Sequence, residues 1–206
     1  MKSLLVATTN KAKLAELMLG LKKLEQKRLK VFSLNNLSIT EEPEETGKTF
    51  KENSLLKAKF YAKISGLPTL ADDGGLIIPA LNNEPGVKSR RWLGREATDK
   101  ELIDYALRRL HPTGEIRIDR TAYLETCLCF YDPKTKKQLC EQEKIKGLIA
   151  EKPSGRPTLG YPYRALFIVK EFNKYYDELT DEEHKIINHR LKALKRLVIK
   201  IETVLK

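Results

Sequence analysis

The 206-residue sequence predicts an α/β protein. Short apolar runs, typical of buried strands, alternate along the chain with segments of helical periodicity. A threonine followed three residues later by a glutamate, the capping box that starts many helices, occurs at Thr49, Thr98 and Thr180. The strand, turn and helix at the start of the chain are the usual opening of an α/β domain.

The N-terminal half opens with a strand over residues 3–8. Leucines then recur at helical spacing, at Leu14, Leu17, Leu21 and Leu24. Residues 34–47 are acidic and contain a proline, so the next helix begins only after Thr49 and ends near Gly66.

A second strand is predicted over residues 69–71, followed directly by Asp72-Asp73-Gly74-Gly75. We expect the glycines to permit a tight backbone there and both carboxylates to lie at the carboxyl end of the strand. Ligands favour that edge of an α/β sheet.

The C-terminal half contains a helix from Thr98 to about His111-Pro112 and then two long antiparallel strands, over 116–131 and 138–149. A loop rich in proline and glycine over 155–160 leads to a strand over 165–169. One final helix follows Thr180, and its predicted apolar stripe consists of Ile187, Leu191, Leu194, Val198, Ile201 and Leu205.

Composition excludes some classes of protein and leaves others open. No apolar run approaches the roughly 20 residues of a membrane span, so we expect a cytoplasmic protein that does not bind membranes. The formal net charge of +11 attracts polyanions, including nucleic acid, but lacks the aromatic interleaving of a single-strand binder. Cys127, Cys129 and Cys140 have no metal-ligand spacing and an odd count, so we expect reduced, structural thiols.

Two groups of side chains could carry chemistry with phosphate and metal. Thr8, Thr9, Asn10 and Lys13 lie where the first strand joins its helix, a position that attracts phosphate, although an N-cap with solvated lysines explains the same residues. Carboxylates gather at 41–45 and again at Asp72 and Asp73, and adjacent aspartates favour a neutralising cation such as Mg²⁺. Turn-forming aspartates that face solvent are the alternative.

Two further clusters are basic. The segment 85–91 is a turn with three cations, and His189-Arg190 stands early in the final helix. The forked donors of arginine suit phosphate, although each of these residues could equally be a surface cation.

The order of these pieces resembles the inosine triphosphate pyrophosphatase family along nearly the whole chain. The resemblance rests on Thr8-Thr9-Asn10 with Lys13, Glu44-Glu45-Thr46-Gly47, Glu52-Asn53 with Lys57-Ala58, Ala71-Asp72-Asp73-Gly74-Gly75-Leu76, Pro85-Gly86 with Ser89 and Arg91, Gly160-Tyr161, and His189-Arg190.

That resemblance implies an elongated α/β fold with a long mixed sheet flanked by helices. It implies a single domain over residues 1–206, with two lobes around a central cleft, and a homodimer. It also implies the hydrolysis of deaminated purine nucleoside triphosphates (ITP, dITP and XTP) to the monophosphate and pyrophosphate, by water attack at the α-phosphorus with Mg²⁺, for which Mn²⁺ could substitute.

The resemblance also assigns roles to residues. Glu45 and Asp72 would hold the metal, and Asp73 would contact it while orienting or deprotonating water, with Lys57 as a second catalytic residue. Substrate-binding residues would be Thr8, Thr9, Asn10, Lys13, Asn53, Gly74, Ser89, Arg91, Leu159, Tyr161, His184, His189 and Arg190.

The departures from the family pattern concern mostly the base. Leu159 and Pro162 replace the phenylalanine and aspartate of the family's Phe-Gly-Tyr-Asp-Pro loop, so Tyr161 or Tyr163 is left to stack on the base. Lys88 precedes Ser89 where the family often has an aromatic residue, and Arg90 replaces an alanine. The other replacements are Gly74 for serine, His184 for lysine and Asn188 for serine. Two alternatives therefore stay open, namely a pyrophosphatase for a different modified nucleotide and a catalytically silent relative that binds nucleotides or nucleic acid.

Overall fold

We describe the fold from a computed structural model, which covers residues 2–25, 29–111 and 118–204. Its helices are α1 (Lys11–Glu25), α2 (Phe50–Ser65), α3 (Asp99–Arg109), α4 (Asp181–Ile187) and α5 (His189–Val204). Its strands are β1 (Lys2–Ala7), β2 (Leu29–Ser33), β3 (Thr69–Ile78), β4 (Glu84–Pro85), β5 (Thr121–Tyr131), β6 (Gln138–Ile149), β7 (Phe167–Val169) and β8 (Lys174–Tyr175).

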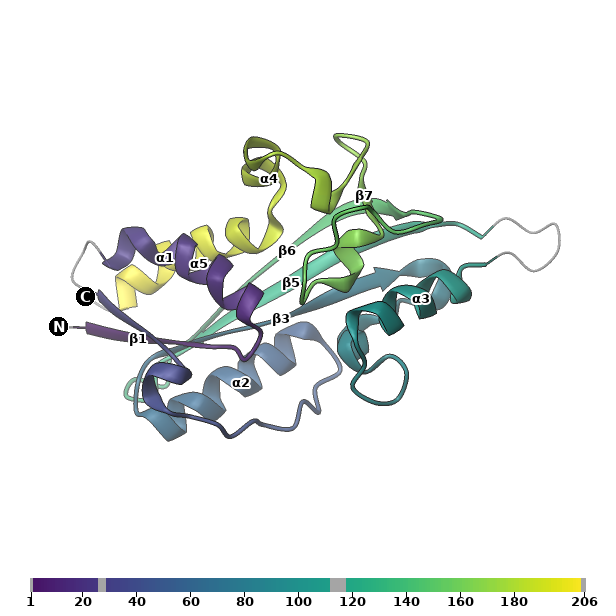
Figure 1. The fold of residues 1–206 in the computed structure, drawn as a ribbon. Coiled ribbons are helices and arrows are strands. Elements are labelled where there is room, and N and C mark those ends of the chain that lie inside the picture. The colour runs from purple at the N-terminus through teal and green to yellow at the C-terminus, as the bar shows by residue number, and fades with distance from the viewer. Residues whose placement is uncertain (1, 26–28, 112–117, 205–206) are drawn as a thin grey trace. The chain divides into compact units, whose positions relative to one another are not determined.

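The strands form one mixed sheet, which confirms the predicted α/β class with a mixed sheet flanked by helices (Figure 1). Within the described residues the sheet has eight strands in the order β2-β1-β3-β5-β6-β7-β8, and β4 pairs with β3. Strand β1 is parallel to β2 and β3, whereas β4, β7 and β8 are antiparallel to their partners.

The chain folds into two compact units, and each is made of separate stretches of sequence. Unit 1 comprises Met1–Asp73, Thr126–Glu143 and His189–Lys206, and unit 2 comprises Gly74–Glu125 and Lys144–Asn188. Strands β3, β5 and β6 contribute residues to both units. None of the described helices is long and apolar enough to cross a membrane.

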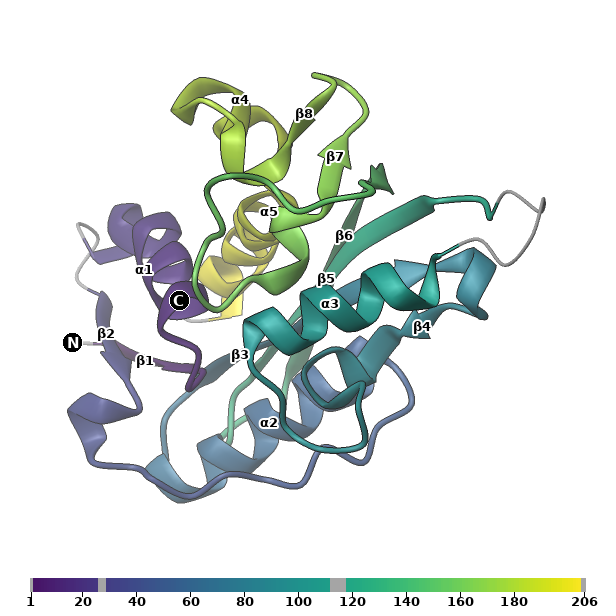
Figure 2. The same cartoon turned by 45° about the vertical axis from the view of Figure 1, so that its right-hand side comes forward.

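Unit 1 has helices on both faces of its part of the sheet. Leu4 and Val6 of β1 pack with α1 and α5, which lie side by side in Figures 1 and 2, whereas Leu5 and Ala7 pack with α2. This alternation follows from the strand geometry, in which successive side chains point to opposite faces. The same alternation continues along β3 and decides where the acidic residues of that strand point.

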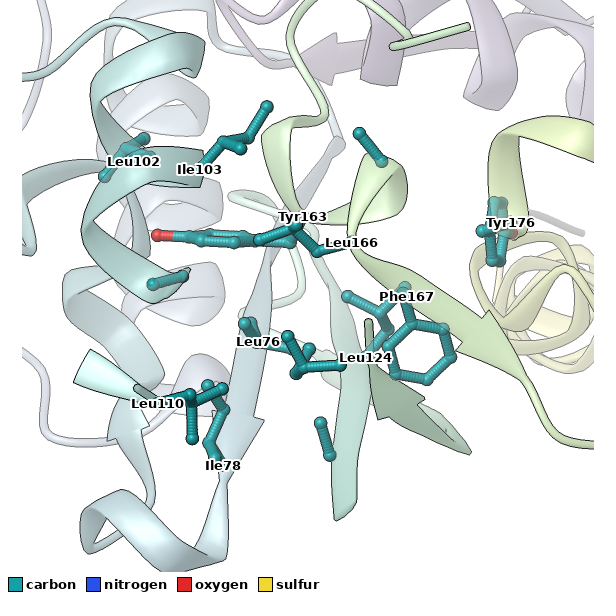
Figure 3. Close-up of a cluster of buried hydrophobic side chains, with 14 of the residues drawn as sticks. Leu76, Ile78, Leu102, Ile103, Leu110, Leu124, Tyr163, Leu166, Phe167 and Tyr176 are labelled. Atoms are coloured by element: carbon teal, nitrogen blue, oxygen red, sulfur yellow. The ribbon is translucent and has the colours of Figure 1, made fainter. Parts of the chain in front are cut away.

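Unit 2 has its own apolar core, shown in Figure 3. Leu76 and Ile78 of β3 and Leu124 of β5 contribute to it, and α3 contributes Leu102 and Ile103. The segment after the Pro- and Gly-rich loop adds the buried side chains Tyr163, Leu166 and Phe167.

The three predicted capping boxes are confirmed. Thr49, Thr98 and Thr180 each accept a hydrogen bond from the glutamate amide three residues later, and the glutamate side chain accepts one in return. Strand β6 also has the predicted bounds, and β5 begins at Thr121. The predicted residues Pro112, Ile116 and Leu205 and the side chain of Leu24 lie outside the described part of the chain.

Two predictions about elements are wrong. Strand β3 does not stop at Ala71 but runs through Asp72-Asp73-Gly74-Gly75 to Ile78. Gly75 permits a close approach to Ser89 and does not form a turn. The predicted final helix is two helices, since Asn188 has ψ of 101° and ends α4. Ile187 therefore packs in the core of unit 2, whereas Leu194 and Ile201 pack in unit 1.

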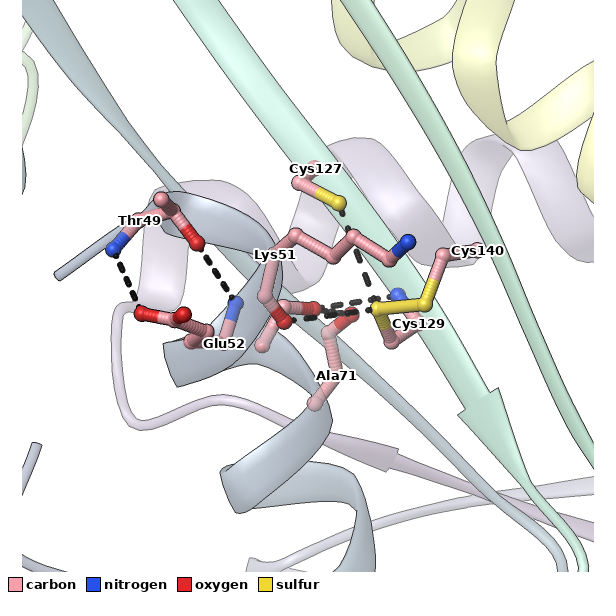
Figure 4. Close-up of a disulfide and its surroundings, with 8 residues drawn as sticks. Thr49, Lys51, Glu52, Ala71, Cys127, Cys129 and Cys140 are labelled. Atoms are coloured by element: carbon pink, nitrogen blue, oxygen red, sulfur yellow. Dashed lines mark hydrogen bonds between the residues drawn. A yellow bond between two sulfur atoms is a disulfide. The ribbon is translucent and has the colours of Figure 1, made fainter. Parts of the chain in front are cut away.

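The cysteine prediction is also wrong, since Cys129 and Cys140 form a disulfide (Figure 4). The backbone N–H of Asp132 donates to the carbonyl of Lys137 at 3.0 Å and closes the turn between β5 and β6. Three residues before Asp132 on the β5 side is Cys129, and three residues after Lys137 on the β6 side is Cys140. The two cysteines therefore lie opposite each other. Neither the number of cysteines nor their spacing shows this cross-strand pairing.

Candidate active site

Asp72 is the most deeply buried acid of the candidate site. Its side chain contacts Lys13 Nζ at 2.8 Å and Arg190 Nε at 3.3 Å, and it accepts a hydrogen bond from the hydroxyl of Thr126. Arg190 also donates to Glu16 at 2.7 Å, so α1, α5, β3 and β5 all contribute to this group. All of these residues lie in unit 1.

Asp73 has different partners, although it is the next residue along β3. Its Oδ1 lies 3.4 Å from Lys57 Nζ, and the same Nζ lies 2.7 Å from Glu45 Oε1. Lys57 belongs to α2, which packs on the other face of the sheet in unit 1 from α1 and α5. The alternation of the strand therefore points the two adjacent carboxylates in different directions and gives each different cations in direct contact.

The two aspartates differ in pKa because of these surroundings. Burial raises the pKa of Asp72, but the charges of Arg190 and Lys13 outweigh burial and hold it well below the ordinary value. Burial raises the pKa of Asp73, and the opposing effects of Lys57 and Lys13 do not cancel that increase. Burial lowers the pKa of Lys57, but Asp73 and Glu45 outweigh it and leave the pKa raised.

Asp73 has a carboxylate oxygen that is available for further chemistry. Its Oδ2 is buried and has no hydrogen-bond partner among the described residues. A buried, unsatisfied carboxylate oxygen is costly unless a cation or a water satisfies it. Asp73 thus combines a weakened acidity with an unsatisfied oxygen, as a general base requires.

The cluster fits a magnesium ion that takes some of its ligands from the protein and the others from water and substrate phosphates. Within the described ranges, no three Asp, Glu, His or Cys side chains form a ready-made metal cage. Mg²⁺ does not need such a cage, because it is commonly bound through one or two carboxylates together with water and substrate phosphates. Glu45 and Asp73, which both contact Lys57, supply such a pair, whereas both oxygens of Asp72 are engaged by cations.

The residues at the start of α1 and α2 have local roles that the structure makes clear. Asn10 Oδ1 accepts from the backbone N–H groups of Ala12 and Lys13 at 2.9 and 3.0 Å, so Asn10 caps α1 as the N-cap interpretation predicts. Thr8 is half-buried and Thr9 is exposed beside it. The buried Asn53 accepts from the backbone of Gly47 at 2.7 Å and holds the segment that carries Glu45.

Other predicted site residues lie in unit 2. Gly74 is extended in β3, and Ser89 donates to the Gly86 carbonyl at 2.6 Å while accepting from Leu76 N–H at 3.2 Å. Arg91 is exposed. In the loop and α4, Leu159 is 87% exposed, Tyr161 is half-buried, and His184 packs edge-on against Tyr176. The predicted residue His189, in contrast, is buried at the start of α5 in unit 1.

Sequence reasoning missed three residues of these groups, Glu16, Thr126 and Arg164. Glu16 stands three residues after Lys13 on α1, a spacing that places both on one face of the helix and could have indicated it. Thr126 comes from β5, far from β3 in sequence, and no local pattern indicates its contact with Asp72. Arg164 is buried between two aromatic rings of unit 2, which its sequence neighbours do not reveal.

Comparison with known proteins assigns the chain to a protein family. The fold and the cluster define an α/β protein with buried, separately neutralised carboxylates on one strand of a mixed sheet. A sequence model of the Ham1 family matches residues 4–200, and the chain belongs to that family. This membership confirms the resemblance found in the motifs.

Individual relatives match over nearly their full length. The dITP/XTP pyrophosphatase of Protochlamydia amoebophila is 37% identical over 201 residues, which cover 98% of each chain. The dITP/XTP pyrophosphatase of Bacillus subtilis is 38% identical over 197 residues, or 96% of each chain. The solved structure of a HAM1 protein from Coxiella burnetii has a TM-score of 0.84 and 35% identity, covering 98% of this chain and 100% of that one.

Proposed function

We propose that the chain hydrolyses dITP, ITP and XTP to the monophosphate and pyrophosphate, by attack of water at the α-phosphorus. The observation that carries this proposal is the buried Asp73 beside Lys57, with a raised pKa and a carboxylate oxygen that no described residue satisfies. The reaction and its purine substrates are also supported by the relatives, which are dITP/XTP pyrophosphatases.

In this proposal Asp73 orients the attacking water and takes its proton. Its buried Oδ2, which has no hydrogen-bond partner among the described residues, supports that role, because a general base needs an oxygen free to accept the proton. Lys57 holds Asp73 and Glu45 in place and offsets negative charge that develops on the transferring phosphoryl group. Lys13 and Arg190 would grip the triphosphate, and Lys13 has three donors, of which Asp72 needs only one.

Divalent metal is part of the proposal, and Mg²⁺ is the ion that the carboxylates suit best. Bound magnesium would neutralise phosphate charge and lower the pKa of a bound water. Glu45 and Asp73 are supported as ligands by their shared contact with Lys57. Asp72 remains a proposed third ligand, and its contact with Lys13 would have to change for it to act as one.

The test is pyrophosphate release from a panel of standard, deaminated and modified nucleoside triphosphates. We expect turnover of dITP, ITP and XTP with Mg²⁺ or Mn²⁺, none with EDTA, and a loss of at least a hundredfold in kcat for Asp73→Asn. Asp104→Asn, which changes an exposed aspartate on α3, is the matched control and should keep full activity.

The outcome of the panel separates the three functions that the sequence left open. Selective turnover of another modified nucleotide would reassign the substrate, as the replaced base loop around Leu159 and Pro162 allows. A panel without any turnover would contradict the enzyme and favour a silent binder. Salt-dependent binding of long DNA or RNA would then indicate nucleic acid as the ligand.

The remaining parts of the proposal concern organisation. We infer one catalytic domain over residues 1–206, because the family match at 4–200 runs through both compact units. The homodimer implied by the resemblance is tested by analytical ultracentrifugation, and the cytoplasmic location by cell fractionation.

A further inference from the structure

Asp72 and Asp73 differ in which of their oxygens a lysine contacts. Lys57 Nζ lies 3.4 Å from Oδ1 of Asp73 and leaves Oδ2 of that residue without a hydrogen-bond partner among the described residues. Lys13 Nζ, in contrast, lies 2.8 Å from Oδ2 of Asp72, and apart from this ion pair the described chain gives that buried oxygen no hydrogen bond. A divalent ion can therefore bind Asp73 beside Lys57, but it reaches Oδ2 of Asp72 only in competition with Lys13.

The second cation on Asp72 is held more firmly. Arg190 Nε lies 3.3 Å from Oδ1 of Asp72, and the same guanidinium donates to Glu16 at 2.7 Å. The side chains of Arg190 and Glu16 are 4% and 9% exposed, so this pair is buried. Thr126 also donates to Oδ1 of Asp72. Asp72 thus has a fixed arginine on one oxygen and Lys13 on the other.

Lys13 has the properties of a cation that can move. It stands in the first turn of α1, its side chain is 15% exposed, and its ammonium group is carried on a flexible four-carbon chain. Its positive charge also acts on Asp73, where it opposes the increase in pKa that burial causes. Lys13 therefore places positive charge beside both aspartates, which is what a metal shared by the two carboxylates would do.

We propose that Lys13 competes with the divalent metal for Oδ2 of Asp72, and that it moves to the phosphates of the substrate when the metal takes its place. The inference rests on the proposed function and adds to it a coupling between metal and triphosphate. A divalent ion repels an ammonium group, so the two compete for one carboxylate oxygen. Once Lys13 leaves Asp72, all three of its donors are available to phosphate. Lys13 is then a positioning residue through which metal and triphosphate strengthen each other's binding.

The first test measures Mn²⁺ binding without nucleotide, from the electron paramagnetic resonance signal of free Mn²⁺. We expect Lys13→Met to bind Mn²⁺ about fivefold more tightly than the wild type, because it removes the competing charge. Lys13→Gln should do the same, whereas Lys13→Arg keeps the charge and should bind as weakly as the wild type. Lys11→Met, the matched control, removes a charge from an exposed position of the same helix and should change the affinity by less than about twofold.

A double-mutant cycle shows whether the effect acts through Asp72. In an Asp72→Asn background, Lys13→Met should change Mn²⁺ affinity by less than about twofold, since the contested oxygen has lost its charge. A merely structural role of Lys13 predicts the opposite sign, because a disturbed site binds metal less tightly, and urea unfolding checks that each variant is folded. The inference is overturned if Lys13→Met binds Mn²⁺ no more tightly than the wild type, or if the gain persists without the charge of Asp72.

The second test measures the affinity for inorganic tripolyphosphate by calorimetry, with EDTA and with saturating Mn²⁺. With EDTA, Asp72 holds Lys13, so Lys13→Met should weaken binding by only about threefold. With Mn²⁺, Lys13 is available to phosphate, and the same change should weaken binding by about tenfold. An equal loss under the two conditions contradicts the movement of Lys13 from Asp72 to phosphate.

Failure of the proposed function would give a different result. Wild-type protein would then release no pyrophosphate from any nucleotide, but neither binding test depends on turnover. Tighter Mn²⁺ binding by Lys13→Met in such a protein supports the competition at Asp72. Turnover of dITP, ITP or XTP by the wild type, together with unchanged Mn²⁺ binding in Lys13→Met, supports the function and overturns the inference.

Discussion

At the scale of single residues, the adjacent carboxylates Asp72 and Asp73 show how a strand can give neighbours opposite properties. One faces two cations and has a depressed pKa, and the other faces one lysine and has a raised pKa. The motif predicts that two acids lie together near cations. It cannot predict which acid is which, because that depends on the helices that cover each face of the sheet.

Stability should depend on pH through Asp72. Its folded pKa lies below its unfolded pKa, so its contribution is complete above the unfolded value and is lost as pH falls through the acid range. We expect Asp72→Asn to lower the free energy of unfolding at pH 7 by about 3 kcal/mol, since it leaves Lys13 and Arg190 uncompensated.

Urea unfolding in EDTA, from pH 7 to pH 3, checks this prediction. The wild type should lose stability towards low pH, and the difference between wild type and Asp72→Asn should shrink there. Asp104→Asn, at an exposed site, should follow the wild type. A constant difference across the whole range would contradict the linkage to Asp72.

Gly75 is required for close approach within unit 2. A Cβ at this position would lie 1.9 Å from Ser89 Oγ and 2.9 Å from the Gly86 carbonyl oxygen. We expect Gly75→Ala to destabilise the protein by about 2 kcal/mol through overpacking, as measured by thermal or urea unfolding. At Gly155 an added Cβ meets nothing within 4 Å, so Gly155→Ala is the control and should change stability by less than about 0.5 kcal/mol.

At the scale of elements, local signals predicted most of what the structure shows. Each capping box starts a helix, because the hydrogen bonds that define it are made within four residues. The break at Asn188 was not predicted, since the apolar stripe keeps its helical spacing across it, from Ile187 to Leu191. The two sides pack in different units, so tertiary contacts and not local propensity decide where the helix ends.

The hairpin of β5 and β6 gives a prediction about the disulfide. Closing a loop with a sequence separation of 11 residues should contribute about 3 kcal/mol, so reduction or Cys140→Ser should lower stability by that amount. Denatured, unreduced protein should show one thiol with a thiol-specific reagent and reduced protein three. Three thiols before reduction would show that the bridge does not form. Cys127→Ser is the matched variant that retains the bridge.

The hairpin also connects to the site through Ser54 of α2. Its hydroxyl donates to the carbonyl of Ala71, just before Asp72, and accepts from the backbone N–H of Cys129, which is one half of the disulfide. One side chain thus links α2, β3 and β5. Such a link joins residues distant in sequence and has no local signature, which is why the sequence did not reveal it.

At the scale of the whole molecule, the charge of the protein and the charge of its site have opposite signs. The chain carries a net charge of +11, which attracts nucleotides over a distance. The described cluster, in contrast, sets four carboxylates (Glu16, Glu45, Asp72 and Asp73) against three cations (Lys13, Lys57 and Arg190).

Metal-free polyphosphate should therefore bind poorly. We expect inorganic tripolyphosphate to bind at least tenfold more tightly with Mg²⁺ than with EDTA, as measured by calorimetry, because the metal removes the repulsion from the carboxylates. Glu45→Gln should narrow that difference, while Glu202→Gln, a change on α5 away from the cluster, should preserve it. Equal affinity with and without metal would contradict this account of the cluster.

The excess of acid in the cluster has a consequence for what the protein recognises. The carboxylates of the site repel the phosphates of a metal-free nucleotide. The same carboxylates would attract a nucleotide that is bound to Mg²⁺. Under the proposed function, the species that the protein selects is the magnesium complex of a nucleotide rather than the metal-free nucleotide. Its rate of turnover should follow the fraction of the nucleotide that is bound to metal, and a fall in free magnesium would slow it even where the nucleotide is abundant.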